Sequence, residues 1–338
     1  MDMLDPINPI KILVHTERIL SIINNEDVAQ IVVGIDISNI CNNDCIWCLY
    51  KHYRAKHNTL MSKKSIFKII PELKKAGVLA LCFSGGGEPT VNKQCSNALI
   101  YARNQGLEVS LNTNGMLLDK ITDEALRSLK YLRVSLDSGS NETHNILHQP
   151  KKLNSFNYII NSLKRICKKN LTTVGIGFLV HKLNCNEIYS LAKLLDEIRC
   201  DYIQIRPLKN ISLSKDDLEA VHEQIKLIKQ NLKIHVYESF SKMTDTINKN
   251  TTFSKCYIKH LVSSIGPDGY VYPCCELRGI KPIGNINSLQ FSEIWNSHKH
   301  KSIMQTINIK DCPPCKYAKS NEMIENFIVN DNIHKNFI

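Results

Sequence analysis

Residues 40–50 read Ile-Cys-Asn-Asn-Asp-Cys-Ile-Trp-Cys-Leu-Tyr and place three thiols close together, at Cys41, Cys45 and Cys48. They follow a largely apolar run, residues 31–37, that is typical of a buried strand. Soft sulfur ligands select iron–sulfur centres, zinc or copper(I) over hard cations. Because a [4Fe-4S] cluster normally takes four cysteines, a loop with three would leave one iron open to a ligand from outside the protein.

The same spacing would also fit one face of a helix, with the three cysteines as buried apolar side chains. Asn42, Asn43 and Asp44 lie between the first two cysteines, however. Such side chains compete for backbone hydrogen bonds and favour turns over helix interiors. We therefore expect a ligand-bearing loop at the end of the first strand.

The spacing Cys-x3-Cys-x2-Cys, with Trp47 directly before the last cysteine, resembles the signature of the radical S-adenosylmethionine (SAM) superfamily. The resemblance implies that Cys41, Cys45 and Cys48 hold a [4Fe-4S] cluster and that Trp47 lies beside SAM. In that family the open iron chelates the amino and carboxylate groups of SAM, and reductive cleavage releases a 5′-deoxyadenosyl radical. It also implies a flavodoxin- or ferredoxin-type electron donor.

Composition narrows the class of protein. The chain has 338 residues, enough for two domains, and 43% of them are apolar. No run of eighteen apolar residues occurs and residues 1–8 lack a signal-peptide pattern, so we expect a cytoplasmic protein without a membrane partner. Thirteen cysteines in a reducing compartment indicate metal ligation rather than disulfides. The net charge of +11 comes mostly from scattered lysines, which predicts no nucleic-acid partner.

Strand-like and helix-like segments alternate along the chain. The pattern predicts an α/β fold, a partial (β/α)6 TIM-like barrel over residues 31–238, after an N-terminal helical extension over 1–30 and before a small iron–sulfur domain over 239–338. Its strands are expected near residues 32–37, 79–83, 108–111, 131–136, 172–180 and 202–205.

Four helix boundaries can be predicted from capping residues. Ser62 is expected to begin one helix, which Gly77 would end, and Thr122 to begin another. Asn184 and Glu187 have the spacing of a capping box for a helix that runs to about residue 199.

Polar motifs follow the strands at their carboxyl ends, where parallel α/β folds place their sites. In residues 84–89, Ser-Gly-Gly-Gly-Glu-Pro, the glycines permit close backbone approach, and Glu88 presents a carboxylate that could accept hydrogen bonds from a ligand ammonium. The alternative is a glycine-rich turn with a solvated Glu88. The stretch resembles the Gly-Gly-Glu-Pro motif of the radical SAM family, which implies that Gly86, Gly87 and Glu88 hold the SAM amino group.

Weaker signals lie at the later strand ends, and each could instead be a turn or a helix cap. The resemblance implies that the cofactor-facing residues there are Thr113, Asn114, Ser135, Asp137, Gln204 and Arg206. The last two stand where family members place groups that face either SAM or the substrate. His144 and His148 are expected on a loop or the surface and receive no role.

A second group of cysteines follows near the C-terminus. Pro267-Asp268-Gly269 predicts a hairpin turn between two short strands, and Cys256, Cys274, Cys312 and Cys315 could enclose a metal. Structural zinc with four cysteines is an alternative that spacing alone does not exclude. The segment 256–315 resembles the SPASM/twitch extension of radical SAM enzymes, which implies a second, auxiliary [4Fe-4S] cluster held by these four residues.

The resemblance makes Cys274 the ligand and leaves the adjacent Cys275 free, either as an apolar filler or as a hydrogen-atom donor in catalysis. The function expected first is a radical SAM oxidoreductase or epimerase that acts on a sugar, aminocyclitol or similar small polar substrate. A peptide-maturing enzyme of the same extension family is the second hypothesis. A non-catalytic metal-binding scaffold, from another class, is the third.

Overall fold

The computed structural model describes residues 8–56, 58–208, 213–238, 253–313 and 315–330. Within these ranges ten strands form one sheet, in the spatial order β10-β9-β8-β1-β2-β3-β4-β5-β6-β7. Their bounds are β1 Val32–Ile35, β2 Ala80–Phe83, β3 Glu108–Thr113, β4 Tyr131–Ser135, β5 Thr173–Val180, β6 Tyr202–Pro207, β7 His235–Glu238, β8 Val262–Ile265, β9 Tyr270–Tyr272 and β10 Gly284–Asn285.

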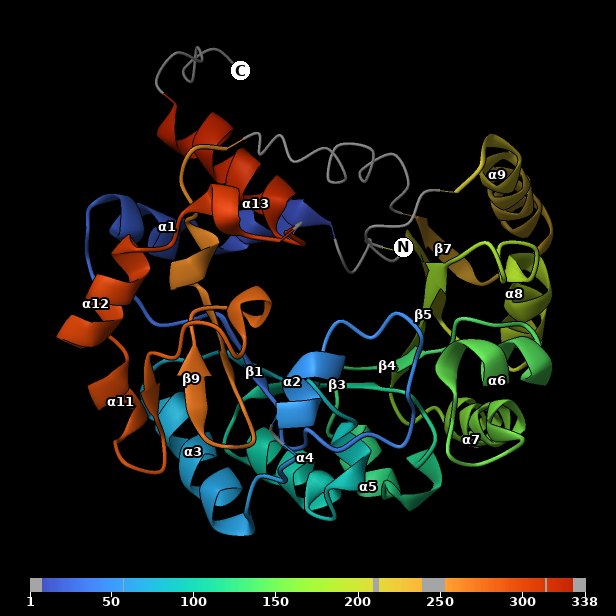
Figure 1. Cartoon of the computed structure of the whole chain (residues 1–338), viewed down its shortest axis with the longest axis horizontal. Coiled ribbons are helices and arrows are strands. Elements are labelled where there is room, and N and C mark those ends of the chain that lie inside the picture. Colours follow the sequence, from blue (N-terminus) through green and yellow to red (C-terminus); the bar gives the residue numbers. More distant parts are fainter. Residues whose placement is uncertain (1–7, 57, 209–212, 239–252, 314, 331–338) are drawn as a thin grey trace.

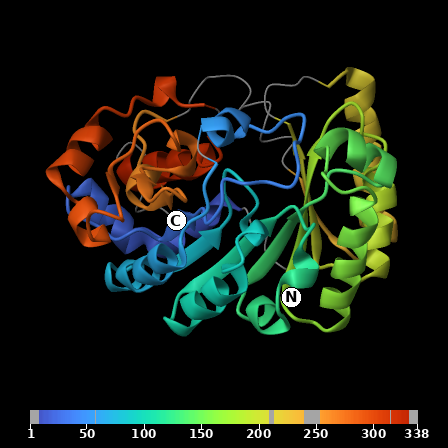
Figure 2. The ribbon, with the colours of Figure 1, turned by 60° about the horizontal axis from the view of Figure 1, so that its bottom comes forward.

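Strands β1 to β7 run parallel, each beside the one before it, which confirms the predicted parallel α/β sheet. The sheet is arched, and helices cover its outer face (Figure 2). These helices are α3 Lys63–Lys75, α4 Cys95–Asn104, α5 Asp123–Arg127, α6 Asn141–His148, α7 Ser155–Lys168, α8 Ile188–Glu197 and α9 Lys215–Asn231. One apolar core lies between the strands and these helices.

Local sequence explains most helix starts. The Ser62 hydroxyl accepts a hydrogen bond from Ser65 N, the Thr122 hydroxyl accepts one from Ala125 N, and Gly77 adopts the left-handed φ of +85° just beyond α3. The predicted capping box at Asn184 is wrong. That side chain accepts from His181 N and donates to the carbonyls of Asp137 and Leu179, so it is not available to α8.

The C-terminal segment, described over residues 253–313 and 315–330, extends the same sheet. The predicted hairpin is present as the antiparallel pair β8 and β9, and β8 pairs in parallel with β1, with Val32 opposite Val262. Among its described residues lie the helices α11 Phe291–Ile294, α12 His298–Gln305 and α13 Ala318–Met323. They lie on the side of the molecule opposite α9 (Figure 1).

The N-terminal extension is helical, with a 3₁₀ turn at Pro9–His15 and α1 at Thr16–Ile23. Ile19 and Ile22 of α1 share a second apolar core with Tyr257, Leu261 and other residues of the C-terminal segment. Helix α1 therefore packs against the C-terminal segment. No helix in the described ranges is long and apolar enough to cross a membrane.

Candidate functional site

The cysteine loop crosses the mouth of the barrel between β1 and the short helix α2, Lys51–Lys56 (Figure 1). It lies along the end of α6, where Ile46 N donates to Leu147 O at 3.0 Å and Asp44 N donates to His148 O at 3.1 Å. Asn42 accepts a hydrogen bond from the Asn114 side chain at 2.7 Å. The segment is a loop, as the intervening polar residues predicted.

His148 joins this loop to the end of β4. Its Nδ1 lies 3.3 Å from Cys45 Sγ, and its Nε2 lies 3.2 Å from Asp137 Oδ2. Burial opposes the charged imidazole, but the hydrogen bonds to Asp137 and Cys45 outweigh it and raise the pKa of His148 to about 10. His144 stacks on this ring at 4.4 Å, and burial lowers its pKa to about 3.

The expectation that His144 and His148 lie on a loop or the surface is therefore wrong. Both are buried residues of α6, whose start is capped by the Ser140 hydroxyl. A signal was available in the sequence. Two histidines four residues apart, after a residue that can cap a helix, predict one helix face turned toward the preceding strand end.

The three loop cysteines are half-buried, and burial raises the pKa of Cys41 to about 11 and that of Cys48 above its ordinary value. In the part of the chain that the structure describes, no three Cys, His, Asp or Glu side chains are arranged to hold a single metal ion. A four-iron cluster is larger than one ion, so its thiolates stand further apart. Three soft thiols on one loop fit such a cluster in donor chemistry.

The glycine-rich turn after β2 packs directly against the start of the cysteine loop. Gly87 N donates to Ser38 O at 3.1 Å, and Glu88 N donates to Ile40 O at 2.9 Å. A Cβ atom on Gly87 would lie 2.5 Å from Ile40 O, and one on Gly86 would lie 2.8 Å from Asn39 Oδ1. Only glycine permits this approach, as predicted, and the partner is the cysteine loop itself.

Glu88 is buried, and protein donors surround its carboxylate. Oε1 accepts from Thr90 N at 3.0 Å and from the Thr90 and Thr113 hydroxyls at 2.6 Å each, and Oε2 accepts from Asn114 N at 2.7 Å. Burial raises the pKa of Glu88. Since each carboxylate oxygen has about two acceptor sites, Oε2 retains room for one further donor. The alternative of a solvated Glu88 is wrong.

The remaining predicted cofactor residues gather around the same mouth. Thr113 and Asn114 contact Glu88, as above, and Trp47 lies with its ring 5.7 Å from that of His181. Ser135 ends β4 and is paired in the sheet with Gly177 of β5. Asp137 is already engaged, because its carboxylate contacts His148 and accepts a hydrogen bond from Leu179 N.

Gln204 and Arg206 lie on β6, on the inner face of the arch. Gln204 is buried, and its Oε1 accepts a hydrogen bond from Arg133 of β4 at 3.2 Å. Arg133 was not among the predicted site residues. It stands two residues before Ser135 on the same strand, so the alternation of side chains already placed it on the same face.

The second group of cysteines also converges. All four predicted ligands line one cavity, together with Tyr317 and other residues: Cys256, Cys274, Cys312 and Cys315. Burial raises the pKa of the Cys274 thiol and of the Cys315 thiol to about 12 in each case. Four soft donors around an otherwise largely apolar cavity fit an iron–sulfur cluster in chemistry.

Cys275 is not among the residues that line this cavity. It begins a 3₁₀ turn, Cys275–Leu277, and lies beside Lys316. Burial opposes the charged form of Lys316, but the charges of Tyr317 and Cys275 outweigh it and raise the pKa of Lys316. The two adjacent cysteines thus have different surroundings, as expected for neighbouring residues at the end of a strand.

A buried ion pair connects the two cysteine sites. Asp36, directly after β1, contacts Arg278, with Arg278 Nε 2.6 Å from Asp36 Oδ2 and Nη2 3.0 Å from Oδ1. The guanidinium also lies 4.9 Å from the ring centroid of Tyr50 at the end of the cysteine loop. Burial raises the pKa of Asp36 to about 6, although the adjacent guanidinium opposes this shift.

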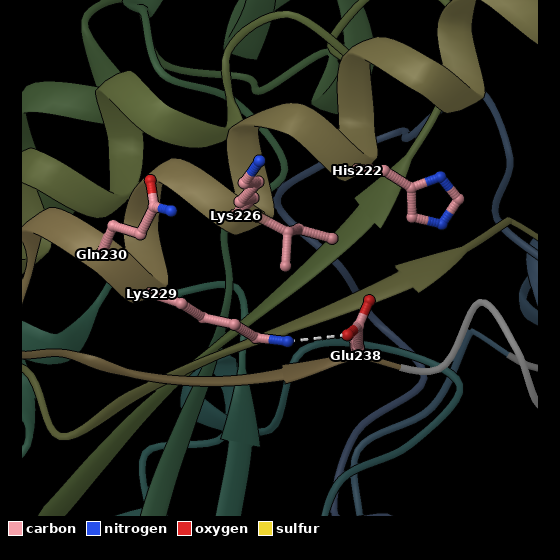
Figure 3. Close-up of a pocket in the computed structure, with 6 residues that line it drawn as sticks. His222, Lys226, Lys229, Gln230 and Glu238 are labelled. Atoms are coloured by element: carbon pink, nitrogen blue, oxygen red, sulfur yellow. Dashed lines mark hydrogen bonds and ion pairs between the residues drawn. The ribbon is translucent and has the colours of Figure 1, made fainter.

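A hollow of about 290 Å³ lies far along the sheet, between α9 and β7. It is lined by His222, Lys226 and Gln230 among others, and a 2.8 Å ion pair joins Lys229 to Glu238 across it (Figure 3). None of the predicted site residues lines this hollow, so we assign no role to it.

The fold and these sites define a class: an arched parallel α/β barrel with a three-thiol loop at its mouth and a four-thiol cavity beside it. The model of the radical SAM superfamily matches residues 35–195, and that of SPASM, an iron–sulfur cluster-binding domain, matches residues 256–317. The chain therefore contains a radical SAM domain, followed by a SPASM iron–sulfur domain. SAM and iron–sulfur clusters are therefore its cofactors.

Two kinds of curated relative share part of the sequence. The Fe-coproporphyrin III synthase of Methanosarcina barkeri is 25% identical over 297 residues, which cover 78% of this chain and 73% of that protein. A probable GTP 3′,8-cyclase of Saccharolobus islandicus is 26% identical over 202 residues, which cover 57% of this chain and 64% of that protein. The match therefore spans slightly less than two thirds of the cyclase.

Solved structures share the fold. Streptococcus suis SuiB bound to S-adenosylmethionine has a TM-score of 0.65 at 18% identity, over 94% of this chain and 76% of SuiB. The structure of anSMEcpe with bound AdoMet has a TM-score of 0.61 at 18% identity, over 88% of this chain and 96% of anSMEcpe. Both structural matches include the barrel and the C-terminal segment.

Proposed function

We propose that this radical SAM enzyme abstracts a hydrogen atom from a small polar substrate and completes a dehydrogenation or an epimerisation. The observation that carries the assignment of the SAM site is the contact between the glycine-rich turn and the cysteine loop. Hydrogen bonds from Gly87 N to Ser38 O and from Glu88 N to Ile40 O fix a buried carboxylate near Cys41, the first of the three thiols.

When bound, the cluster and SAM together supply a 5′-deoxyadenosyl radical. Cys41, Cys45 and Cys48 would hold the [4Fe-4S] cluster, and Glu88 Oε2 would accept a hydrogen bond from the SAM ammonium. The protein itself contributes by positioning the reactants: its barrel walls exclude water and orient the reacting C–H group. The residues proposed to face the rest of SAM are Trp47, Gly86, Gly87, Thr113, Asn114, Ser135 and Asp137. Gln204 and Arg206 are proposed to face either SAM or the substrate.

One auxiliary [4Fe-4S] cluster is proposed at Cys256, Cys274, Cys312 and Cys315, because these four residues line one cavity. Cys275 stands outside that lining, which leaves its thiol for one of two roles. It is an apolar filler, or it donates a hydrogen atom to a substrate radical and makes the enzyme an epimerase.

A small-molecule substrate is supported by the curated relatives, whose names refer to Fe-coproporphyrin III and to GTP. The alternative is a peptide substrate, since a protein of the same fold, SuiB, has been solved bound to its precursor peptide SuiA. The electron donor is proposed to be a flavodoxin or ferredoxin. The domain bounds at residues 30 and 238 stay predictions.

Anaerobic reconstitution with iron, sulfide, SAM and a reductant tests the cofactor assignment. Two four-iron clusters give about eight irons per chain. Replacing Cys41, Cys45 and Cys48 with Ala should remove about half of them and stop formation of 5′-deoxyadenosine. Zinc in place of iron at the second site would contradict the auxiliary cluster. A pool of metabolites and a pool of peptides, offered separately, distinguish the two substrate classes by which one is consumed.

The variant Cys275→Ala tests the donor role. If Cys275 donates the hydrogen atom, the variant keeps both clusters and still forms 5′-deoxyadenosine, but the inverted product disappears. Full turnover would exclude the donor role. Loss of the auxiliary cluster would instead show that Cys275, not Cys274, is the ligand.

A further inference from the structure

Two arginines occupy the inner face of the arch without an acidic partner. Arg133 lies on β4 and Arg206 on β6, and among the described residues neither forms an ion pair. The outer face of β4 is apolar, because Leu132 and Val134 belong to the core beneath the helices. Arg133 therefore projects to the opposite face, into the space that the arch encloses.

The two guanidinium groups converge above Gly177 of β5, the strand between them. A Cβ atom on Gly177 would lie 3.7 Å from Arg133 Nε and 3.8 Å from Arg206 Nη2. Gln204 joins them through its hydrogen bond with Arg133. Arg133 Nε, Arg206 Nε and Gln204 Nε2 are all buried donors without a hydrogen-bond partner in the described structure.

Such an arrangement is costly unless something compensates for it. Two like charges stand close together in a partly dehydrated space, and three buried N–H donors have no acceptor. Burial and the positive charge of Arg133 lower the pKa of Arg206 to about 9. The negative charge of Asp137 raises the pKa of Arg206, but the Asp137 carboxylate already contacts His148 and accepts a hydrogen bond from Leu179 N. An anion between the guanidinium groups would satisfy both charges and all three donors.

We propose that Arg133, Arg206 and Gln204 form a binding site for a carboxylate or phosphate group of the substrate. This deepens the proposed function, on which it rests, by naming the substrate class: a small molecule or a residue that carries an anionic group. Planar guanidinium groups bind such oxyanions through paired, charge-assisted hydrogen bonds. The reacting carbon would then be held at a fixed distance from the anion.

The methionyl carboxylate of SAM is the other anion that could reach this space. Its ammonium, on the same carbon atom, is proposed to contact Glu88, which is hydrogen-bonded to Thr113 at the end of β3. The two guanidinium groups converge above β5, which lies two strands beyond β3. At about 4.8 Å per strand this is roughly 10 Å along the sheet, which is still more than the ammonium and carboxylate of one amino-acid group span. The geometry favours a separate, substrate-borne anion.

The test uses the reconstituted holoenzyme with SAM bound and inorganic phosphate as the probe, followed by calorimetric titration. Wild type should bind phosphate, and Arg133→Gln and Arg206→Gln should each weaken that binding roughly tenfold to a hundredfold. Arg133→Lys, which keeps the charge, should lose less. Arg103→Gln, a matched change at an exposed position on α4, should have no effect. Circular dichroism establishes that each variant is folded.

Phosphate binding that is absent, or equal in wild type and the two glutamine variants, would overturn the proposal. Mutual displacement of phosphate and SAM would also overturn it, because the arginines would then serve the SAM carboxylate. Failure of the proposed function has a different signature. In that case wild type with both clusters and SAM forms no 5′-deoxyadenosine, whatever the phosphate titration shows.

Discussion

Four hydrogen bonds converge on the carboxylate of Glu88, and all four donors belong to the protein. Together they orient the carboxylate and leave Oε2 with the smaller share of donors. A single residue is thereby fixed between the thiol loop and the end of β3. This is the arrangement expected of a group that must meet a ligand ammonium in one orientation.

Glu88→Gln tests this residue, because glutamine keeps the shape and the acceptor that faces Thr90 and Thr113 while it removes the charge. We expect SAM binding to weaken by about 1.5–3 kcal/mol, the value of a charge-assisted hydrogen bond, with iron content unchanged. Calorimetric titration of SAM into reconstituted protein measures it. Glu124→Gln, at an exposed position of α5, is the control, and equal SAM affinity in both variants would reject the assignment.

Single residues differ in how well their roles can be predicted from the sequence. Glu88 could be predicted because it ends a run of glycines that directly follows a strand. Arg278 could not, because its partner Asp36 lies 242 residues away in the chain and no local pattern links the two. His148 lay between these cases: the spacing from His144 was visible, but the contact with Cys45 depends on how the loop packs on α6.

At the scale of elements, strands with a buried apolar face were predictable and edge strands were not. The expected strands at residues 32–37 and 131–136 are present as β1 and β4, each one or two residues shorter. Strand β7 was not predicted, because none of its four residues is buried and so its sequence lacks the apolar pattern. The capping box at residue 184 failed because tertiary partners use the asparagine side chain.

The Asp36–Arg278 pair links two elements, the end of β1 and the 3₁₀ turn after β9. Replacing Arg278 with Met leaves a buried carboxylate without its countercharge, and we expect this to lower the free energy of unfolding by about 3–5 kcal/mol. Urea unfolding of the cluster-free protein measures the change. The double variant Asp36→Asn, Arg278→Met should recover much of the loss, since no unpaired charge remains.

The exposed pair of Lys301 and Asp27 supplies the control for that experiment. It has a similar N···O distance of 3.0 Å, but both side chains are more than half exposed, at 55% and 52%. Lys301→Met should therefore change stability by only about 0–1 kcal/mol. An Arg278→Met variant as stable as Lys301→Met would show that the buried pair does not hold the two elements together.

At the scale of the whole molecule, the barrel and the C-terminal segment form one continuous sheet. Strand β8 pairs with β1 along all four residues of each strand. The N-terminal helix α1 in turn packs on Tyr257 and Leu261 of the same segment. Such pairings between distant parts of the chain carry no local sequence signal. For that reason the sequence does not predict that β8 pairs with β1.

A chain that ends at residue 238 tests this continuity. Its strand β1 would expose unpaired backbone groups along an edge whose side chains Val33 and Ile35 are fully buried in the intact protein, and such edges promote aggregation. Ile19 and Ile22 of α1 would lose their apolar partners as well. We expect the truncated chain to elute as aggregates in size-exclusion chromatography and to unfold without a sharp thermal transition.

Coexpression of residues 239–338 as a separate chain should restore a soluble complex if edge pairing is the cause. A monomeric truncated chain with a cooperative transition would instead show that the barrel is stable without β8.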